Sequence, residues 1–318
     1  MTRFLIRRIL LGILILLLVS IVVFAATQGL PGNAARAILG RQATPARLAA
    51  LTKQLHLNES APAQYWHWLS GIVRGHLGTS AATQGSVSSL ISAPLANSAF
   101  LVFISAIIAV PLSISLGVLM AVKRDKLTDH GLSTGTLLLA ALPEFVIGIG
   151  LALLLATAYV WRALPSVSII PPGEHAWDVP KVVVLPALTL ILAVTPYISR
   201  IMRASMVEVL HSDYVTMARL KGLPNRTVIW RHAVPNAIVP AIQVSALQLA
   251  YMAGGIVVVE YVFSYNGIGT QLVNAVTNRD VPTVQALVMI IGAVYVLVNL
   301  LADLLTIVVT PRLRTAGR

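Results

Sequence analysis

The chain contains no cysteine among its 318 residues, and only 11% of its residues are charged. The lack of cysteine excludes a disulfide framework and a thiolate metal site. So little charge, together with 57% hydrophobic residues and a mean hydropathy of +0.84, does not suit a water-soluble domain of this length. The composition therefore predicts a membrane protein.

Acidic residues are the scarcest charged group, with 11 Asp and Glu against 23 Lys and Arg. In a soluble protein, the resulting net charge of +12 would suggest nucleic-acid binding. In a hydrophobic chain, Lys and Arg in short loops instead set the orientation of the membrane spans. We therefore expect a lipid bilayer around this chain and no nucleic-acid partner.

Long uncharged runs predict an all-α, polytopic protein with six transmembrane helices. The predicted spans are 9–26, 95–122, 144–161, 182–199, 238–259 and 282–302. The first run has 18 residues, which exceeds the apolar core of a signal peptide and favours a retained span over cleavage near Ala25-Ala26-Thr27. The apolar stretch 131–142 has only 12 residues, so we expect it to lie at the interface or to re-enter before Pro143.

The distribution of basic residues orients these spans. With six spans, the segments 1–8, 123–130, 200–232 and 310–318 share one side and hold 15 Lys or Arg in 58 residues. The opposite side holds the other 8 in 110 residues. Because cytoplasmic loops are enriched in Lys and Arg, we expect both termini and the 200–232 loop to be cytoplasmic.

Three regions follow from these spans. We expect an N-terminal transmembrane helix at 1–26, an extracytoplasmic insertion at 27–94 and a transmembrane core at 95–310 with a cytoplasmic coupling loop at 200–237. Thr44-Pro45 is a good N-cap and N1 pair, so the insertion should be helical. A second short helix should open at Pro62. Its aromatic residues at 65–68 favour either the membrane interface or packing against the spans.

The segment 213–237, which reads DYVTMARLKGLPNRTVIWRHAVPNA, separates two long apolar runs. Ser212 or Asp213 can cap a helix that begins there. Lys221 is a favourable cation in the last turn, and Gly222 suits the left-handed C′ position. Pro224 prevents continuation, so the pattern predicts a short helix followed by a sharp turn.

A second helix should follow this turn. Asn225 is expected to cap it, with helix through Arg231 and an end near Pro235. Ala218 and Gly222 lie one turn apart, and small residues allow another backbone to approach closely. This pattern fits docking into a groove of a cytoplasmic partner, and it fits equally an amphipathic surface helix with no partner.

At this point the sequence resembles the permease subunits of ATP-binding-cassette importers, and within them the peptide and nickel branch. Their cytoplasmic signature reads E-A-A, three residues, Gly, nine residues, Ile, one residue, Leu-Pro. Ala218, Gly222 and Pro235 match it, whereas the positions 216 and 217 depart from it and His232 replaces the isoleucine. Further motifs of the branch are RR before the first span, PGN at 31–33, QYWHWL at 64–69, GHLGTS at 75–80, VVVEYVFSYNGIG at 257–269, RDVPTVQ at 279–285 and NLLADLL at 299–305. The branch usually has aspartate where this chain has Asn33, His76 and Thr310.

The resemblance implies a type I importer permease fold in a bacterial inner membrane. It implies a second homologous permease subunit, two cytoplasmic ATPase subunits and an extracytoplasmic substrate-binding protein as partners. The chain itself would bind no cofactor or metal and would catalyse nothing, because ATP is bound by the partner subunits and no phosphate-loop motif is present. The residues implied to couple to the ATPases are Asp213, Tyr214, Val215, Ala218, Arg219, Lys221, Gly222, His232, Pro235 and Asn236. Possible gate or outer-loop contacts are Glu260, Asn266, Gly267, Gly269 and Asp280.

Peptides are the expected solutes, moved by alternating access, with a nickel chelate or another peptide-like solute as the alternative. A stand-alone secondary transporter should show ionisable groups at the middle of the membrane. Glu144, Glu260 and Asp303 all fall near predicted span ends, so that reading is less favoured. Gly254 and Gly255 in the fifth span are expected to permit close helix packing or a bend.

Overall fold

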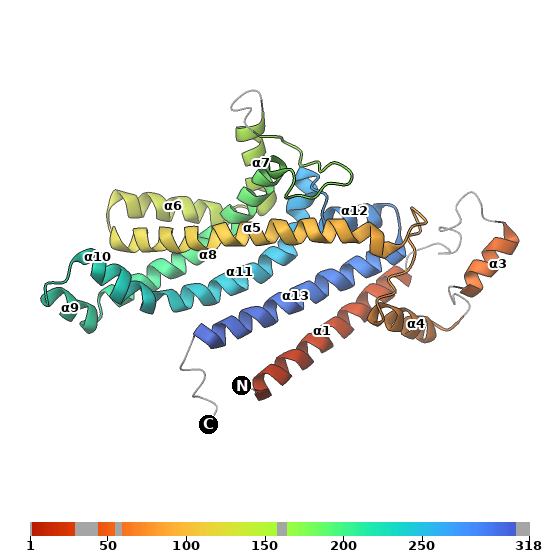
Figure 1. Ribbon diagram of the computed structural model, residues 1–318, viewed down its shortest axis with the longest axis horizontal. Coiled ribbons are helices and arrows are strands. Elements are labelled where there is room, and N and C mark those ends of the chain that lie inside the picture. The colour runs from red at the N-terminus through yellow and green to blue at the C-terminus, as the bar shows by residue number, and fades with distance from the viewer. Residues whose placement is uncertain (1, 29–43, 55–58, 158–163, 310–318) are drawn as a thin grey trace. The chain divides into compact units, whose positions relative to one another are not determined.

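A computed structural model describes residues 2–28, 44–54, 59–157 and 164–309. Most of the described residues are helical, and β-pairing among them is limited to one isolated bridge between Thr79 and Ser86. Asn33 and Thr310, where this chain departs from the usual aspartate of the branch, lie outside the described residues. The helices are α1 (Thr2–Gln28), α3 (Pro45–Gln54), α4 (Ala61–Val73), α5 (Val87–Val122), α6 (Leu127–Ala141), α7 (Glu144–Ala156), α8 (Pro180–Leu210), α9 (Asp213–Leu220), α10 (Asn225–Thr227), the π-helix η2 (Val228–Ala233), α11 (Val234–Phe263), α12 (Ile268–Thr277) and α13 (Val281–Val309) (Figure 1).

Among the described residues, five helical stretches are long and apolar enough to cross a membrane, and the bent pair α6 and α7 gives a sixth if it counts as one span. This confirms the all-α, polytopic prediction. The third span as one straight helix over 144–161 is wrong, because α7 has only 13 residues, or about 20 Å of helix, against a hydrocarbon core of about 30 Å. Pro143 separates α6 from α7, and the two helices meet at an angle of 113°.

Several helices extend beyond the apolar runs that predicted them. α5 begins at Val87 rather than residue 95, and α8 continues to Leu210, past Pro186 and Pro196 in its interior. An apolar run reports the length inside hydrocarbon, whereas the backbone hydrogen-bond ladder continues until a stop signal ends it. α12 was not predicted from the sequence.

Among the described residues, the first of two compact units contains 99–157, 164–265 and 297–309. α8 is its most buried helix. Along 182–199, all of which the structure describes, Tyr197 is the one exposed residue. A Cβ added at Gly117 on α5 would lie 2.6 Å from both the Met202 Cβ and the Ser199 carbonyl oxygen of α8. The absence of a side chain at Gly117 therefore allows α5 and α8 to pack backbone against backbone.

The second compact unit contains residues 2–98 and 266–296. Its core joins the first turns of α5 to α12 and α13, through Val87, Ile91, Ile268, Ala275, Ala286 and Leu287. The Tyr65 ring of α4 packs edge-on against Phe24 of α1 at a centroid distance of 5.4 Å, and its hydroxyl is hydrogen-bonded to Ser20 at 2.8 Å. Of the two readings of this aromatic cluster, packing against a span therefore holds for Tyr65.

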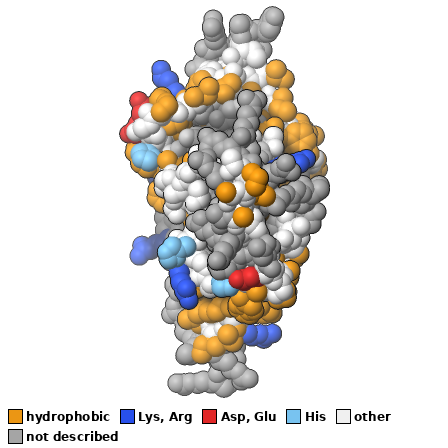
Figure 2. Space-filling view, turned by 90° about the vertical axis from the view of Figure 1, so that its right-hand side faces the viewer, with side chains coloured by type: hydrophobic (Ala, Val, Ile, Leu, Met, Phe, Trp, Pro, Cys, Tyr) orange, Lys and Arg blue, Asp and Glu red, His pale blue; other side chains and the backbone are white. Residues whose placement is uncertain are grey.

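Large hydrophobic side chains remain at the surface of the predicted spans. On α1 they include Leu10 and Val22, and on α5 Phe103. Figure 2 shows hydrophobic side chains in separate patches on the face turned to the viewer, with Lys, Arg, Asp, Glu and His side chains between them. The large apolar side chains exposed along α1 and α5 suit lipid rather than water.

Candidate functional site

The first helix of segment 213–237 forms where the sequence predicts it. α9 begins at Asp213, whose carboxylate is favourable at the positive end of the helix dipole. Ser212 occupies the N-cap position, but its hydroxyl donates a hydrogen bond back to the Val209 carbonyl at 2.6 Å and caps nothing in α9. The predicted start is confirmed, whereas capping by the Ser212 side chain is wrong.

The turn after α9 is a Schellman motif centred on Gly222. The Gly222 N–H donates to the Arg219 carbonyl at 2.9 Å, and the Leu223 N–H donates to the Ala218 carbonyl at 3.3 Å. Gly222 has φ +76°, which confirms the predicted left-handed C′ position. No described atom lies within 4 Å of a Cβ added there, so glycine is required by the backbone conformation and not by crowding inside this chain.

The second helix differs from the prediction in both its start and its end. Pro224 holds the N-cap position and Asn225 is the first helical residue, so Asn225 is not the cap. The helix does not end near Pro235 but runs through η2 into α11, giving one stretch from Asn225 to Phe263. Pro235 lies in the first turn of α11, directly after the wider π turn, where the missing N–H and the ring are tolerated.

The two faces of α9 have different roles. Val215 and Ala218 are buried in one hydrophobic cluster with Met202, Met206 and Val228. The predicted approach of a partner to the small Ala218 is therefore wrong, because this chain already covers that side. The opposite face exposes Tyr214 at 46%, Met217 at 54% and Leu220 at 76% of their surface, and we call these three residues the outer face of α9.

The other predicted coupling residues lie mostly at the surface. Asp213, Arg219, Lys221, Pro235 and Asn236 are exposed, and His232 is half-buried. The Asn236 amide donates to the His232 carbonyl at 2.8 Å. Their coupling role stays a prediction.

Sequence reasoning missed four exposed apolar residues of this segment, namely Met217, Leu220, Leu223 and Trp230. The signal was present for the first two, because 214, 217 and 220 repeat at a spacing of three residues and so share one helix face.

The predicted outer-loop contacts are largely inside the protein. Glu260, Gly267, Gly269 and Asp280 are buried, and their role as gate or outer-loop contacts stays a prediction. The Asp280 carboxylate accepts hydrogen bonds from the Ala81 N–H at 2.8 Å and the Thr283 hydroxyl at 2.7 Å, and also from the Ser80 hydroxyl. It therefore ties the start of α13 to the 79–86 loop within the second unit.

The Asn266-Gly267 turn leads directly into α12. Asn266 is half-buried, and its carbonyl accepts a hydrogen bond from the Asn97 amide at 2.9 Å. Gly267 is the N-cap residue of α12, and the Ile268 N–H donates to the Ser98 hydroxyl at 2.9 Å. These contacts anchor the turn to the first part of α5.

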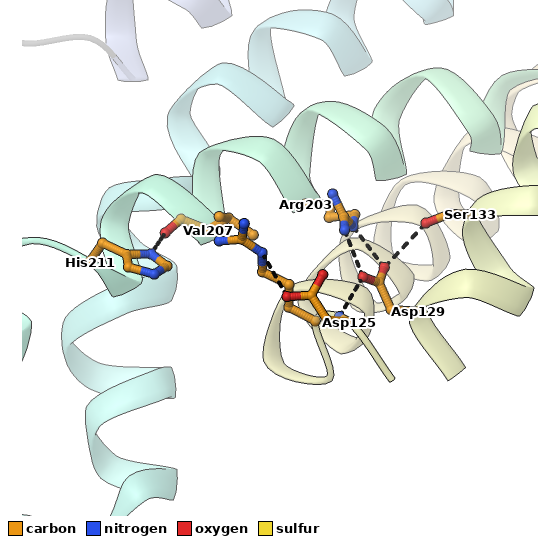
Figure 3. A network of polar contacts seen from close by, with 7 residues as sticks. Asp125, Asp129, Ser133, Arg203, Val207 and His211 are labelled. Carbon is orange, nitrogen blue, oxygen red and sulfur yellow. Dashed lines mark hydrogen bonds and ion pairs between the residues drawn. The ribbon is translucent and has the colours of Figure 1, made fainter. Parts of the chain in front are cut away.

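An ion pair between α6 and α8 with a buried carboxylate was also missed. Asp129, in the first turn of α6, receives two hydrogen bonds from the Arg203 guanidinium of α8 (Figure 3). The Asp125 N–H at 3.1 Å and the Ser133 hydroxyl at 3.2 Å complete the set of donors to the carboxylate. The 74-residue separation of Asp129 and Arg203 left no local sequence pattern that could have paired them.

The apolar helices and their apolar surface together define a multi-pass membrane protein. Residues 113–315 match the family described as binding-protein-dependent transport system inner membrane component, and residues 1–115 match the family of the N-terminal part of such components. The chain belongs to this family. It is a multi-pass inner membrane protein and a transport subunit, which confirms the permease resemblance.

Relatives match over nearly the whole length. The chain is 35% identical over 311 residues to the probable peptide ABC transporter permease protein y4tP of Sinorhizobium fredii, covering 98% of this chain and 99% of that protein. It is 33% identical over 314 residues to the glutathione transport system permease protein GsiC of Salmonella choleraesuis, covering 99% of each. It is 32% identical over 314 residues to the oligopeptide transport system permease protein AppB of Bacillus subtilis, covering 98% of this chain and 99% of that protein.

Proposed function

We propose that this chain is one of two permease subunits of an ATP-driven peptide importer, and that segment 213–237 receives the motion of the cytoplasmic ATPases. Both termini and this segment lie in the cytoplasm. A second permease subunit completes the path, two ATPase subunits bind the ATP, and an outer binding protein delivers the solute. The relatives named above carry the names of peptide, glutathione and oligopeptide permeases, which favours peptides over a nickel chelate.

The outer face of α9 is the observation that carries the coupling role. Tyr214, Met217 and Leu220 are large, apolar and exposed, in a segment that also carries exposed Arg and Lys residues. Exposed apolar groups rimmed by polar residues are typical of protein-protein interfaces. Val215 and Ala218 pack α9 against the hydrophobic cluster of its own subunit. A partner bound to the outer face of α9 would therefore transmit its motion to this cluster.

The transport step follows from this attachment. ATP and the loaded binding protein act as ligands that bind one conformation of the complex better than the other, and this differential affinity shifts the equilibrium between inward-open and outward-open states. The turn at Gly222 passes the motion into the continuous helical stretch from Asn225 to Phe263. The permease therefore needs no catalytic residue of its own.

A charge substitution on the outer face tests the proposal. We expect Leu220→Glu to reduce copurification of the ATPases with the tagged permease by about tenfold or more, because a buried unpaired carboxylate at an interface costs several kcal/mol. ATP-dependent uptake of trialanine into vesicles, in the presence of the binding protein, should fall in parallel. The amount of permease in the membrane should not change.

Leu127→Glu is the matched control, because Leu127 is also a large apolar residue, is 91% exposed and lies outside the segment on α6. It should leave copurification and uptake unchanged. Intact ATPase copurification with Leu220→Glu would refute docking at α9. A wild-type complex that assembles but does not take up small peptides would refute the solute while leaving the docking role in place.

A further inference from the structure

Glu144 lies in the bent pair of α6 and α7, which the sequence did not predict. It is the first residue of α7, directly after the break at Pro143, and its carboxylate lies against Gly255 of α11. A Cβ added at Gly255 would be 2.9 Å from one carboxylate oxygen and 3.1 Å from the other. Gly255 is eight residues, or about 12 Å, from the end of α11 at Phe263, so the carboxylate lies well inside the length of that helix.

Two tyrosines lie near this carboxylate. Tyr251 lies one turn before Gly255 on α11, with its side chain in electrostatic range of Glu144, and Tyr197 of α8 lies close enough to Tyr251 for electrostatic interaction. Tyr251 is 53% exposed and Tyr197 is 44% exposed. Three helices thus bring polar groups to one accessible patch, and we call Glu144, Tyr197 and Tyr251 the Glu144 cluster.

The surface beside the cluster is open. Leu247, Tyr251, Gly254 and Val258 are exposed and follow one another at steps of four, three and four residues, so they form one stripe along α11. No described atom lies within 4 Å of a Cβ added at Gly254. A carboxylate inside a span is costly against lipid and is typically found facing a water-filled cavity or path. The stripe therefore fits the wall of such a path.

We propose that the Glu144 cluster is a cation subsite in the translocation path and that it takes the primary ammonium group of a passing peptide. The carboxylate accepts charge-assisted N–H hydrogen bonds, and the faces of Tyr197 and Tyr251 suit a cation through their ring quadrupoles. The chain as a whole has a net charge of +12, whereas the Glu144 carboxylate supplies a negative charge at this patch. This charge attracts cations and repels anions. The choice of a peptide ammonium rests on the proposed function, whereas the preference for a cation does not.

The cysteine-free chain allows a direct test. In the purified complex carrying Gly254→Cys or Val258→Cys, membrane-impermeant methanethiosulfonates of opposite charge compete for one thiol. We expect the cationic reagent to react about tenfold faster than the anionic one, as expected for a carboxylate within about 12 Å at an intermediate dielectric. Glu144→Gln should remove this preference. Glu208→Gln, which removes an exposed carboxylate elsewhere on α8, should not.

Two reagent results would overturn the subsite. If neither reagent modifies either cysteine, the stripe is covered by lipid or by the partner permease. If the cationic and the anionic reagent react equally fast with Glu144 in place, the surface is accessible to water but does not select cations.

Uptake tests the ligand. Glu144→Gln should reduce trialanine uptake about tenfold while ATPase copurification stays at the wild-type level, and unchanged uptake would overturn the ammonium assignment. If the wild-type complex takes up no trialanine but still prefers the cationic reagent, the peptide function fails and the cation subsite stands.

Discussion

Arg203 of α8 holds Asp129 of α6 through both carboxylate oxygens. Its Nε lies 2.7 Å from Oδ1 and its Nη2 lies 2.6 Å from Oδ2, the parallel geometry of a bidentate pair. Asp129 is only 2% exposed, while the Arg203 side chain keeps 31% of its surface accessible. The pair therefore fixes the first turn of α6 to α8, about two turns before α8 ends at Leu210.

Arg203→Ala should destabilise the protein by about 3 kcal/mol, because it leaves a buried carboxylate without its countercharge. Arg203→Lys should destabilise the protein less than Arg203→Ala, since an ammonium keeps the positive charge but cannot make the two parallel hydrogen bonds. The thermal unfolding midpoint in detergent measures both effects. Arg200→Ala, which removes an exposed arginine from the same helix, is the control and should shift the midpoint little. Equal shifts for the Arg200 and Arg203 variants would show that the pair contributes no specific stability.

Gly117→Ala should be strongly destabilising, by about 2–3 kcal/mol, because the added methyl would overlap Met202 and the Ser199 carbonyl of α8. Gly135→Ala on α6 is the matched change, since no described atom lies within 4 Å of its added Cβ. There the higher helix propensity of alanine should stabilise by about 0.5–1 kcal/mol. We expect Gly117→Ala to lower the thermal unfolding midpoint and Gly135→Ala to raise it. If both variants raise the midpoint, α5 and α8 are further apart than described.

Gly222→Val should impair coupling, because a β-branched residue at φ +76° costs more than the roughly 1–2 kcal/mol of an ordinary left-handed residue. We expect ATPase copurification and uptake to fall while the amount of permease in the membrane is unchanged. Gly222→Asn should retain most of both, since asparagine tolerates the left-handed region. If the Asn variant loses as much copurification and uptake as the Val variant, a partner that contacts residue 222 excludes any side chain there. The left-handed backbone conformation would then not be the reason for glycine.

Asp280→Ala should destabilise the second compact unit by about 2–3 kcal/mol, because Ser80, Ala81 and Thr283 lose a buried charged acceptor. Limited proteolysis of the 79–86 loop measures this effect locally. Asp178→Ala is the control, because Asp178 is exposed and accepts a single backbone hydrogen bond, from His175. Unchanged protease resistance in the Asp280 variant would indicate that other contacts hold the loop.

Local chemistry predicted the parts of the fold that depend on a few neighbouring residues. The start of α9 at Asp213 and the left-handed turn at Gly222 are of this kind, because a helix dipole and a positive φ restrict residue choice directly. The helix break at Pro143 belongs here too. What the sequence could not reveal was that 131–141 is helical and that α6 forms a bent pair with α7, since the angle depends on packing of α6 against α8 and of α7 against α8 and α11.

The candidate site was predicted in location and only partly in detail. A periodicity of three to four residues identifies two faces of α9, but it does not tell which face the chain covers itself. Ala218 therefore appeared available, while Met217 appeared only as a departure from the family signature. The Glu144 contact with Gly255 joins residues 111 positions apart (255 minus 144), beyond the reach of any local pattern.

The continuous helical stretch from Asn225 to Phe263 links the turn at Gly222 to the far end of α11. Taken as one straight helix, its 39 residues would span about 58 Å, so a tilt of about 10° at one end would displace the other by about 10 Å. A tilt about the Gly222 turn would thus displace the buried Glu260, three residues from the far end, by nearly the full amplitude, while Tyr251 would move less. Under the proposed coupling role, a small displacement at this turn would become a larger displacement at the opposite end of the stretch.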